Sequence, residues 1–286
     1  MFASVESFSC QGLDGVGTFN KSNEDILVFS ENGYGAIDGT RLSADVGAEL
    51  REPVSLTSFL QKELAGVLSC NESTARECLI SANTSWRQFL DLNGVTTIRK
   101  DGPAATAALI KKANLTEYSW AQTGDCYLIE ETFGGEFDIV SPADSRMTHN
   151  ELQRLQLSHK LLSEGLTIRD VQCETSYVDL LRELFLTRNV DRSTLNGEVE
   201  FANLLNGGIR DVGNVCSLIM FTDGMVWPTS PYGGDVRLTA KEIIRLGIRS
   251  YHANLQKLFL DDECCRNFVR FKLMDDASAI VIKFFK

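Results

Sequence analysis

The sequence contains no segment with the properties of a membrane-spanning helix. Nowhere do about 18 consecutive residues avoid charged side chains. Residues 1–17 also lack the basic segment followed by an apolar segment that marks a secretory signal. We therefore expect a cytoplasmic protein without a membrane partner.

Positive charge is also scarce. The chain has 28 lysines and arginines against 39 aspartates and glutamates, which gives a formal net charge of -11 at pH 7. Such an excess repels nucleic-acid phosphates, and no basic run with interleaved aromatic residues offsets it. We expect no nucleic-acid partner. For most of these acids, a solvated surface that keeps the protein soluble is sufficient explanation.

The side chains that bind zinc are few or unsuitably spaced. Only three histidines occur, and the eight cysteines contain no C-x-x-C pair, even where Cys264 and Cys265 are neighbours. We expect reduced, mostly buried thiols and no zinc site. His149, His159 and His252 fall in expected helices away from the acidic motifs, so we assign none of them as a general acid.

The composition favours one globular domain over residues 1–286. With 43% hydrophobic residues, the chain can bury one substantial core. Strand-like runs occur at 1–9, 25–30, 33–38, 104–110, 118–122, 126–130, 137–140, 218–222, 268–271 and 279–285. Helical spacing covers 41–69, with Pro53 as a potential break, 73–92 and 239–260. Strands in sequential groups between helical pairs predict an α+β layered domain, and the four runs from 104 to 140 favour an antiparallel meander.

A helical cap or insertion is expected at about 145–195. Leucines at helical spacing, such as Leu152 and Leu155, predict two helical segments between residues 148 and 188. These segments either cover the core or form a mobile cap, and the sequence leaves both interpretations open.

Acidic residues stand at the ends of strand-like runs in five places. These are Asn23-Glu24-Asp25, Asp38-Gly39, Gly124-Asp125, Thr222-Asp223-Gly224 and Asp275-Asp276. Any one of them has a simple explanation, because Asp and Gly are ordinary turn formers. Together they predict more, since the ends of neighbouring strands converge on one rim of a sheet. Carboxylates crowded there raise one another's pKa unless a cation neutralises them, and oxygen-only ligand sets suit Mg²⁺ and Mn²⁺.

The order of these motifs resembles that of the metal-dependent protein phosphatase 2C family, and its bacterial members in particular. The motifs are Asn23-Glu24-Asp25, Gly35-Ala36-Ile37-Asp38-Gly39, Thr106-Ala107, Gly124-Asp125, Phe221-Thr222-Asp223-Gly224 and Asp275-Asp276-Ala277-Ser278. Each is short, but the six stand in the family's order and span nearly the whole chain.

The resemblance implies a four-layer α-β-β-α sandwich, with central antiparallel sheets flanked by helices. It also implies a metal-dependent serine/threonine phosphatase with two bound Mn²⁺ or Mg²⁺ ions. A third site would raise the number of ions to three. Water activated by the metals would attack phosphorus without a covalent phosphoenzyme. Asp38 would bridge the two central metals, and Gly39 would offer its carbonyl to one of them.

The resemblance assigns the remaining ligands residue by residue. Asp223 and Asp275 would complete the shell of one metal, so that Asp38, Asp223 and Asp275 form the catalytic core of the set. Glu24 would support the other metal directly or through water, and Asp125 would help to hold the third ion.

The chain departs from the family where the phosphate is expected to bind. Family members carry an arginine four residues before the glutamate, and here that position is Asn20, followed by Lys21. A lysine binds phosphate as a point charge without the bidentate geometry of arginine. Arg41, after Asp38-Gly39, could replace the missing arginine or be a solvated residue at a helix start. The phosphate could also be held by the metals alone or by a residue of the region 148–188.

Two classes of function are therefore expected. The first is an active phosphatase that acts on phosphoserine and phosphothreonine in proteins and opposes a cognate serine/threonine kinase in signalling. The second is a weak or inactive pseudophosphatase that binds a phosphoprotein without turnover. Retention of the aspartates favours the first, because a carboxylate cluster without a metal is electrostatically unfavourable.

Overall fold

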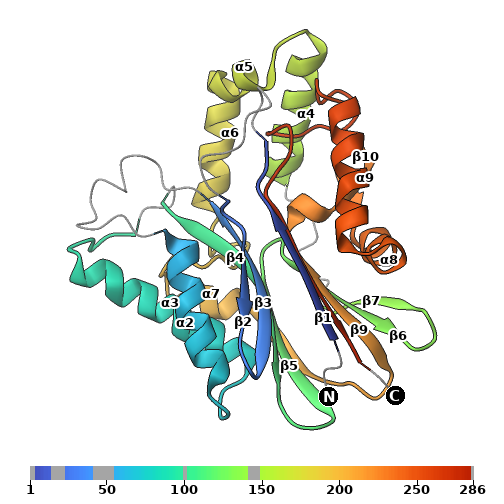
Figure 1. Ribbon diagram of the computed structural model, residues 1–286. Coiled ribbons are helices and arrows are strands. Elements are labelled where there is room, and N and C mark those ends of the chain that lie inside the picture. The colour runs from blue at the N-terminus through green and yellow to red at the C-terminus, as the bar shows by residue number, and fades with distance from the viewer. Residues whose placement is uncertain (1–3, 14–22, 41–54, 99–101, 141–148, 285–286) are drawn as a thin grey trace.

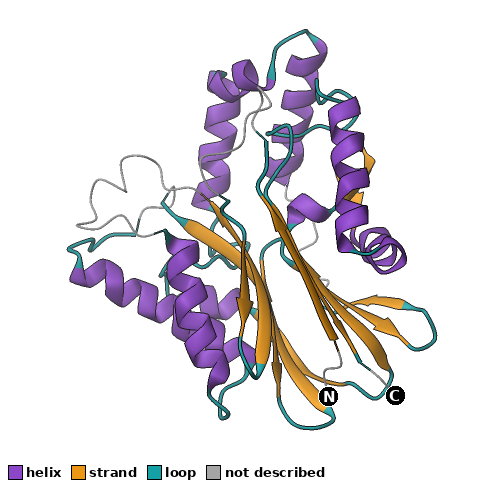
Figure 2. Ribbon diagram, viewed as in Figure 1, coloured by secondary structure: helices purple, strands orange, loops and turns teal. Residues whose placement is uncertain are grey.

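The computed structural model describes residues 4–13, 23–40, 55–98, 102–140 and 149–284 (Figure 1). Within these ranges, two five-stranded antiparallel sheets stack face to face, and a pair of helices covers the outer face of each (Figure 2). This arrangement confirms the expected four-layer α-β-β-α sandwich.

The strands fall into two large sheets and a small hairpin. The first sheet runs in the order β1 (Ser4–Cys10), β12 (Ala277–Lys283), β9 (Val215–Phe221), β6 (Tyr127–Thr132) and β7 (Phe137–Ile139). The second sheet runs in the order β2 (Ile26–Phe29), β3 (Gly33–Thr40), β4 (Ala104–Lys112), β5 (Glu117–Thr123) and β8 (Asn206–Asp211). The strands β10 (Trp227–Ser230) and β11 (Gly233–Asp235) form the hairpin.

Both faces of the central strands are apolar because the sheets are covered on both sides. Along β12, Ile280 and Ile282 point into the core between the sheets, whereas Ala279 and Val281 pack against the outer helices. Successive side chains of a strand face opposite sides, so a continuous apolar run serves two cores at once.

Two helix pairs cover the outer faces. The pair α2 (Leu56–Ser69) and α3 (Ala75–Leu92) lies on the second sheet, and the pair α8 (Val236–Leu246) and α9 (Ile248–Asp261) lies on the first. Helix α3 begins with a reciprocal capping box, in which the Thr74 side chain accepts from the Glu77 N–H and the Glu77 carboxylate accepts from the Thr74 N–H.

Three further helices stand above one end of both sheets (Figure 1). These upper helices are α4 (His149–Ser163), α5 (Ile168–Cys173) and α6 (Thr175–Leu186). Only two helical segments were expected, but a capping box between Thr167 and Asp170 starts a separate short helix. Buried residues of α4 to α6, including Leu162 and Tyr177, form a small core with Cys265 and Val269.

The structure corrects three other expectations. The run from 104 to 140 is not one meander, because β5 pairs with β8 and β6 pairs with β9 in different sheets. The expected helix 239–260 is two helices that meet at Gly247, whose φ of 79° ends α8. The expected strand at 268–271 is irregular chain. The short helix α7 (Phe201–Leu204) and the 3₁₀ turn η1 (Asp223–Met225) were not expected.

Other expectations concern the start of α2, the cysteines and membrane spans. Helix α2 begins at Leu56, and the expected helical residues 41–54 lie outside the described part of the chain. All eight cysteines are free thiols, but only Cys78, Cys126 and Cys265 are buried, so the expectation of mostly buried thiols is wrong. In the described ranges no helix combines the length and the apolar character that crossing a bilayer requires.

Candidate metal centre

Three aspartates from distant parts of the sequence meet at the ends of the strands. Asp38 lies in β3, Asp125 lies in the turn between β5 and β6, and Asp223 follows β9. One carboxylate oxygen of each lies within 4.8 Å of the others. The two sheets contribute jointly, because Asp125 stands where the chain passes from the second sheet to the first.

A tight turn places Asp125. Gly124 has a φ of 61°, and a Cβ at this position would lie 2.1 Å from Cγ2 of Thr106. Glycine alone therefore fits both the backbone conformation and the space. Thr106, which pairs with Asp38 across β3 and β4, donates its hydroxyl to Asp125 at 3.0 Å. Thr106 thus fixes the position of Asp125 relative to Asp38.

A buried network ties the strand ends together beneath these aspartates. The Thr222 hydroxyl donates to Asp25 at 2.6 Å and accepts from the Ser278 N–H at 3.0 Å. Asp276, which is 2% exposed, accepts from the N–H groups of Gly12 at 2.6 Å and Glu24 at 2.8 Å. Asp276 therefore positions the backbone that carries Glu24.

The aspartates are poorly matched by protein cations. Burial raises the pKa of Asp38, and the carboxylates of Asp223, Asp25, Asp125 and Asp275 raise it further. Burial is also the largest cause of the raised pKa of Asp223. The negative charges of Asp125, Asp275 and Asp25 raise this pKa further, and the positive charge of Lys272 lowers it.

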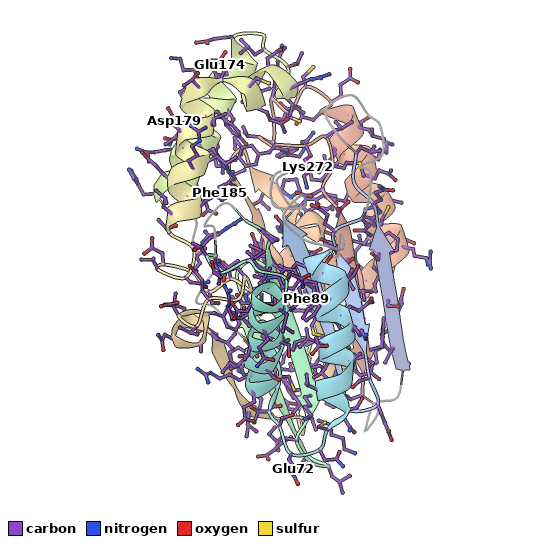
Figure 3. The ribbon with its side chains drawn as sticks, turned by 90° about the vertical axis from the view of Figure 1, so that its left-hand side faces the viewer. Glu72, Phe89, Glu174, Asp179, Phe185 and Lys272 are labelled. Atoms are coloured by element: carbon purple, nitrogen blue, oxygen red, sulfur yellow. The ribbon has the colours of Figure 1, made fainter. Side chains whose placement is uncertain are left out.

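Among the described residues, Lys272 is the cation that acts on the pKa of Asp223, and Figure 3 shows it near the strand ends. Its ammonium group forms an ion pair with Asp275. Burial works to lower the pKa of Lys272, but the carboxylates of Asp275, Asp38 and Asp223 outweigh it, and the pKa is raised. One lysine cannot neutralise this number of acids, so the oxygen-rich cluster fits a divalent cation.

A cavity of about 1040 Å³ opens over the cluster. Its floor carries all six residues that the family resemblance assigns to metal, namely Glu24, Asp38, Gly39, Asp125, Asp223 and Asp275. Side chains of the upper helices, such as Leu181 and Phe185, form the opposite wall. Figure 3 shows Phe185 at the end of α6 that faces the sheets.

The expected phosphate-binding residues Asn20, Lys21 and Arg41 lie outside the described residues. The sequence analysis did not single out Lys272 or Arg154, although both line the cavity. Lys272 carried a weak signal, since it stands three residues before Asp275. Arg154 carried none, because its contacts are made with residues far away in the sequence.

The chain is similar to known proteins in structure. No protein-family model matches it, and no curated protein matches it in sequence. A bacterial serine phosphatase matches with a TM-score of 0.57 at 13% identity, over 98% of this chain and 97% of that one. Serine/threonine phosphatase Stp1 from Staphylococcus aureus matches with a TM-score of 0.56 at 13% identity, over 100% and 96%.

A third match contains metal. The catalytic domain of the serine/threonine protein phosphatase PstP, in complex with two manganese ions, matches with a TM-score of 0.55 at 15% identity, over 98% of this chain and 97% of that one. The chain therefore has the fold of bacterial serine/threonine phosphatases of the 2C type. The resemblance carried by the short motifs is confirmed at the level of the fold.

Proposed function

We propose that this chain is a metal-dependent phosphatase that hydrolyses phosphoserine and phosphothreonine esters on proteins. The observation that carries the proposal is the convergence of Asp38, Asp125 and Asp223 within 4.8 Å at the floor of a large cavity. The phosphatase fold supports the same function.

In this proposal the floor residues hold two Mn²⁺ or Mg²⁺ ions and, through Asp125, a third. Asp38, Asp223 and Asp275 supply the central carboxylates, and Glu24 and the Gly39 carbonyl complete the set. Bound ions would supply positive charge for the phosphoryl oxygens and a water acidic enough to attack phosphorus near neutral pH.

The surrounding residues orient the ligands. Thr106 fixes one oxygen of Asp125 by a hydrogen bond, which leaves the other oxygen for a ligand. Asp276 holds the backbone of Glu24, and Lys272 keeps a positive charge beside the place where the phosphate would lie. None of the three histidines, all of them described, lines the cavity, so in this proposal water would donate the proton to the leaving group.

The cellular role follows from this chemistry as part of the same proposal. A cytoplasmic enzyme of this kind would act on phosphoprotein substrates and oppose a serine/threonine kinase in signalling.

One observation favours a second function. The ion pair between Lys272 and Asp275 places a protein cation among the proposed ligands. A chain that relied on this lysine instead of metal would bind phosphoproteins without turnover, as a pseudophosphatase does.

Hydrolysis of an aryl phosphate with Mn²⁺, with and without a chelator, separates the two functions. Turnover that depends on Mn²⁺ and disappears in Asp223→Asn supports the enzyme. Asp138→Asn is the matched control, because Asp138 is exposed on β7 away from the cavity. Phosphopeptide binding without any turnover would support the pseudophosphatase, and full turnover in excess chelator would exclude the proposed chemistry.

A further inference from the structure

Arg154 of α4 has an unusual environment in the wall of the cavity. Its guanidinium carbon lies 3.9 Å from the centre of the Phe271 ring and 5.8 Å from that of Tyr177. Its Nε atom is buried and has no hydrogen-bond partner. Among the described residues, the side chain forms no hydrogen bond or ion pair at all.

Such an arginine is costly to keep in a folded protein. A guanidinium carries five N–H donors, and the buried Nε–H of Arg154 has lost the hydrogen bond that water provided without gaining one from the protein. Burial lowers the pKa of Arg154, although not enough to remove its charge. By contrast, the enclosed Arg270 makes an ion pair with Asp262 and donates to backbone carbonyls.

The groups around Arg154 leave a net positive charge. Among the described residues, the charged groups that act on Arg154 are Glu151 and Arg192, which form an ion pair with each other. Two arginines and one glutamate give a local charge of 2 − 1 = +1. Arg154 and the aspartates of the floor line one cavity, but none of these aspartates is among the described groups that shift the pKa of Arg154.

We propose that Arg154 forms a second anion-binding subsite, which takes an acidic side chain of the substrate next to the residue whose phosphate lies on the floor. This inference rests on the proposed function and narrows its substrate class to phosphoproteins with an acidic flank. The Phe271 and Tyr177 rings hold the guanidinium in place, and its unused N–H groups suit the two oxygens of a carboxylate or phosphate.

The test is a binding measurement that needs no turnover. Three fluorescent peptides carry a non-hydrolysable phosphonate in place of phosphothreonine. One has two aspartates beside it, one has alanines there, and one has a second phosphonate. Fluorescence anisotropy with Mn²⁺ present gives the Kd of each peptide.

We expect the wild type to bind an acidic-flank peptide about tenfold more tightly than the alanine peptide, as one charge-assisted contact would give. Arg154→Met keeps an apolar stem against Phe271 but lacks the charge, and should reduce this ratio to about one. Arg154→Lys should retain part of the preference. Arg182→Met on α6 is the matched control, because Arg182 is 72% exposed and lies outside the cavity lining.

Several outcomes overturn the proposal. If the wild type binds neither acidic-flank peptide more tightly than the alanine peptide, the subsite does not exist, even if the protein is an active phosphatase. Equal weakening of all three peptides by Arg154→Met would mean that Arg154 holds the substrate phosphate itself. Conversely, a preference that depends on Arg154 in a protein without turnover supports the subsite and refutes the phosphatase. The preferred acidic peptide shows whether carboxylate or phosphate is the ligand.

Discussion

Two acidic regions of this molecule are built on opposite principles. Asp262, 7% exposed at the end of α9, accepts from the N–H groups of Arg266, Asn267 and Phe268 at 3.0–3.1 Å and pairs with Arg270 at 3.0 Å. The aspartates at the cavity floor face one another instead, with Lys272 as their neighbouring cation. An acid paired with a protein cation leaves that cation unpaired when it is removed, whereas a cluster of acids without enough protein cations is suited to an external cation.

The largest expected effect is on catalysis, when one carboxylate of the cavity floor is neutralised. Asp38→Asn removes a negative charge from the proposed ligand set, so Mn²⁺-dependent hydrolysis of an aryl phosphate should fall by about a thousandfold. Initial rates at saturating Mn²⁺ measure the loss, and circular dichroism checks that the fold is retained. A variant with more than about a tenth of the wild-type rate would contradict the assignment of Asp38.

Substitution of Asp262, the acid that is paired within the protein, should change the stability of the fold. Asp262→Ala leaves the Arg270 charge buried and unpaired, so the free energy of unfolding should decrease by about 3–5 kcal/mol. Urea denaturation measures it. Asp179→Ala is the control, because Asp179 belongs to an exposed pair with Arg182 and should change the value by less than about 1 kcal/mol. If both substitutions changed the free energy of unfolding by the same amount, the buried pairing of Asp262 would have no larger effect than the exposed pairing of Asp179.

The unmatched cluster should bind and be stabilised by metal. At about a hundredfold excess over its dissociation constant, Mn²⁺ should stabilise the native state by about 2.7 kcal/mol, since the site exists only in the folded protein. Asp275→Asn should reduce this gain. A melting temperature that stays constant across a Mn²⁺ titration would show that the cluster holds no ion and would favour the pseudophosphatase.

The last prediction concerns the effect of pH on the metal-free protein. Burial raises the pKa of Asp25 from 3.8 to about 7, with the charges of Asp275 and Asp276 adding to the shift and the Thr222 hydrogen bond opposing it. Between these two values the folded state binds the proton more strongly than the unfolded state does. Stability should therefore decrease as pH rises through this window.

Melting temperatures of chelator-treated protein across that range measure the slope, and Asp25→Asn should make it smaller, while the raised pKa values of Asp38 and Asp223 maintain the rest. A melting temperature that increases from pH 4 to pH 7 would contradict the raised pKa of Asp25.

The sequence predicted the floor of the cavity better than its wall. Acids beside glycine at strand ends, such as Asp38 and Asp223, are visible because turn chemistry and strand patterning are local. The contact of Arg154 with Phe271 is not local, since it depends on how α4 packs on an irregular segment near the end of the chain. The failed meander has the same origin, because strand pairing across two sheets leaves no periodic signal in either strand.

The position of β12 has a consequence for the order of folding. This strand follows every other described strand in the chain, yet it lies inside the first sheet, between β1 and β9. Asp276, just before it, also holds the backbone of Gly12 and Glu24. During synthesis on the ribosome, the second sheet and its helices can form before β12 is made, but the proposed metal centre must wait for the residues from 275 onward. A chain that ends before residue 275 could therefore form the second sheet and its helices, but it would lack the complete first sheet and the proposed activity.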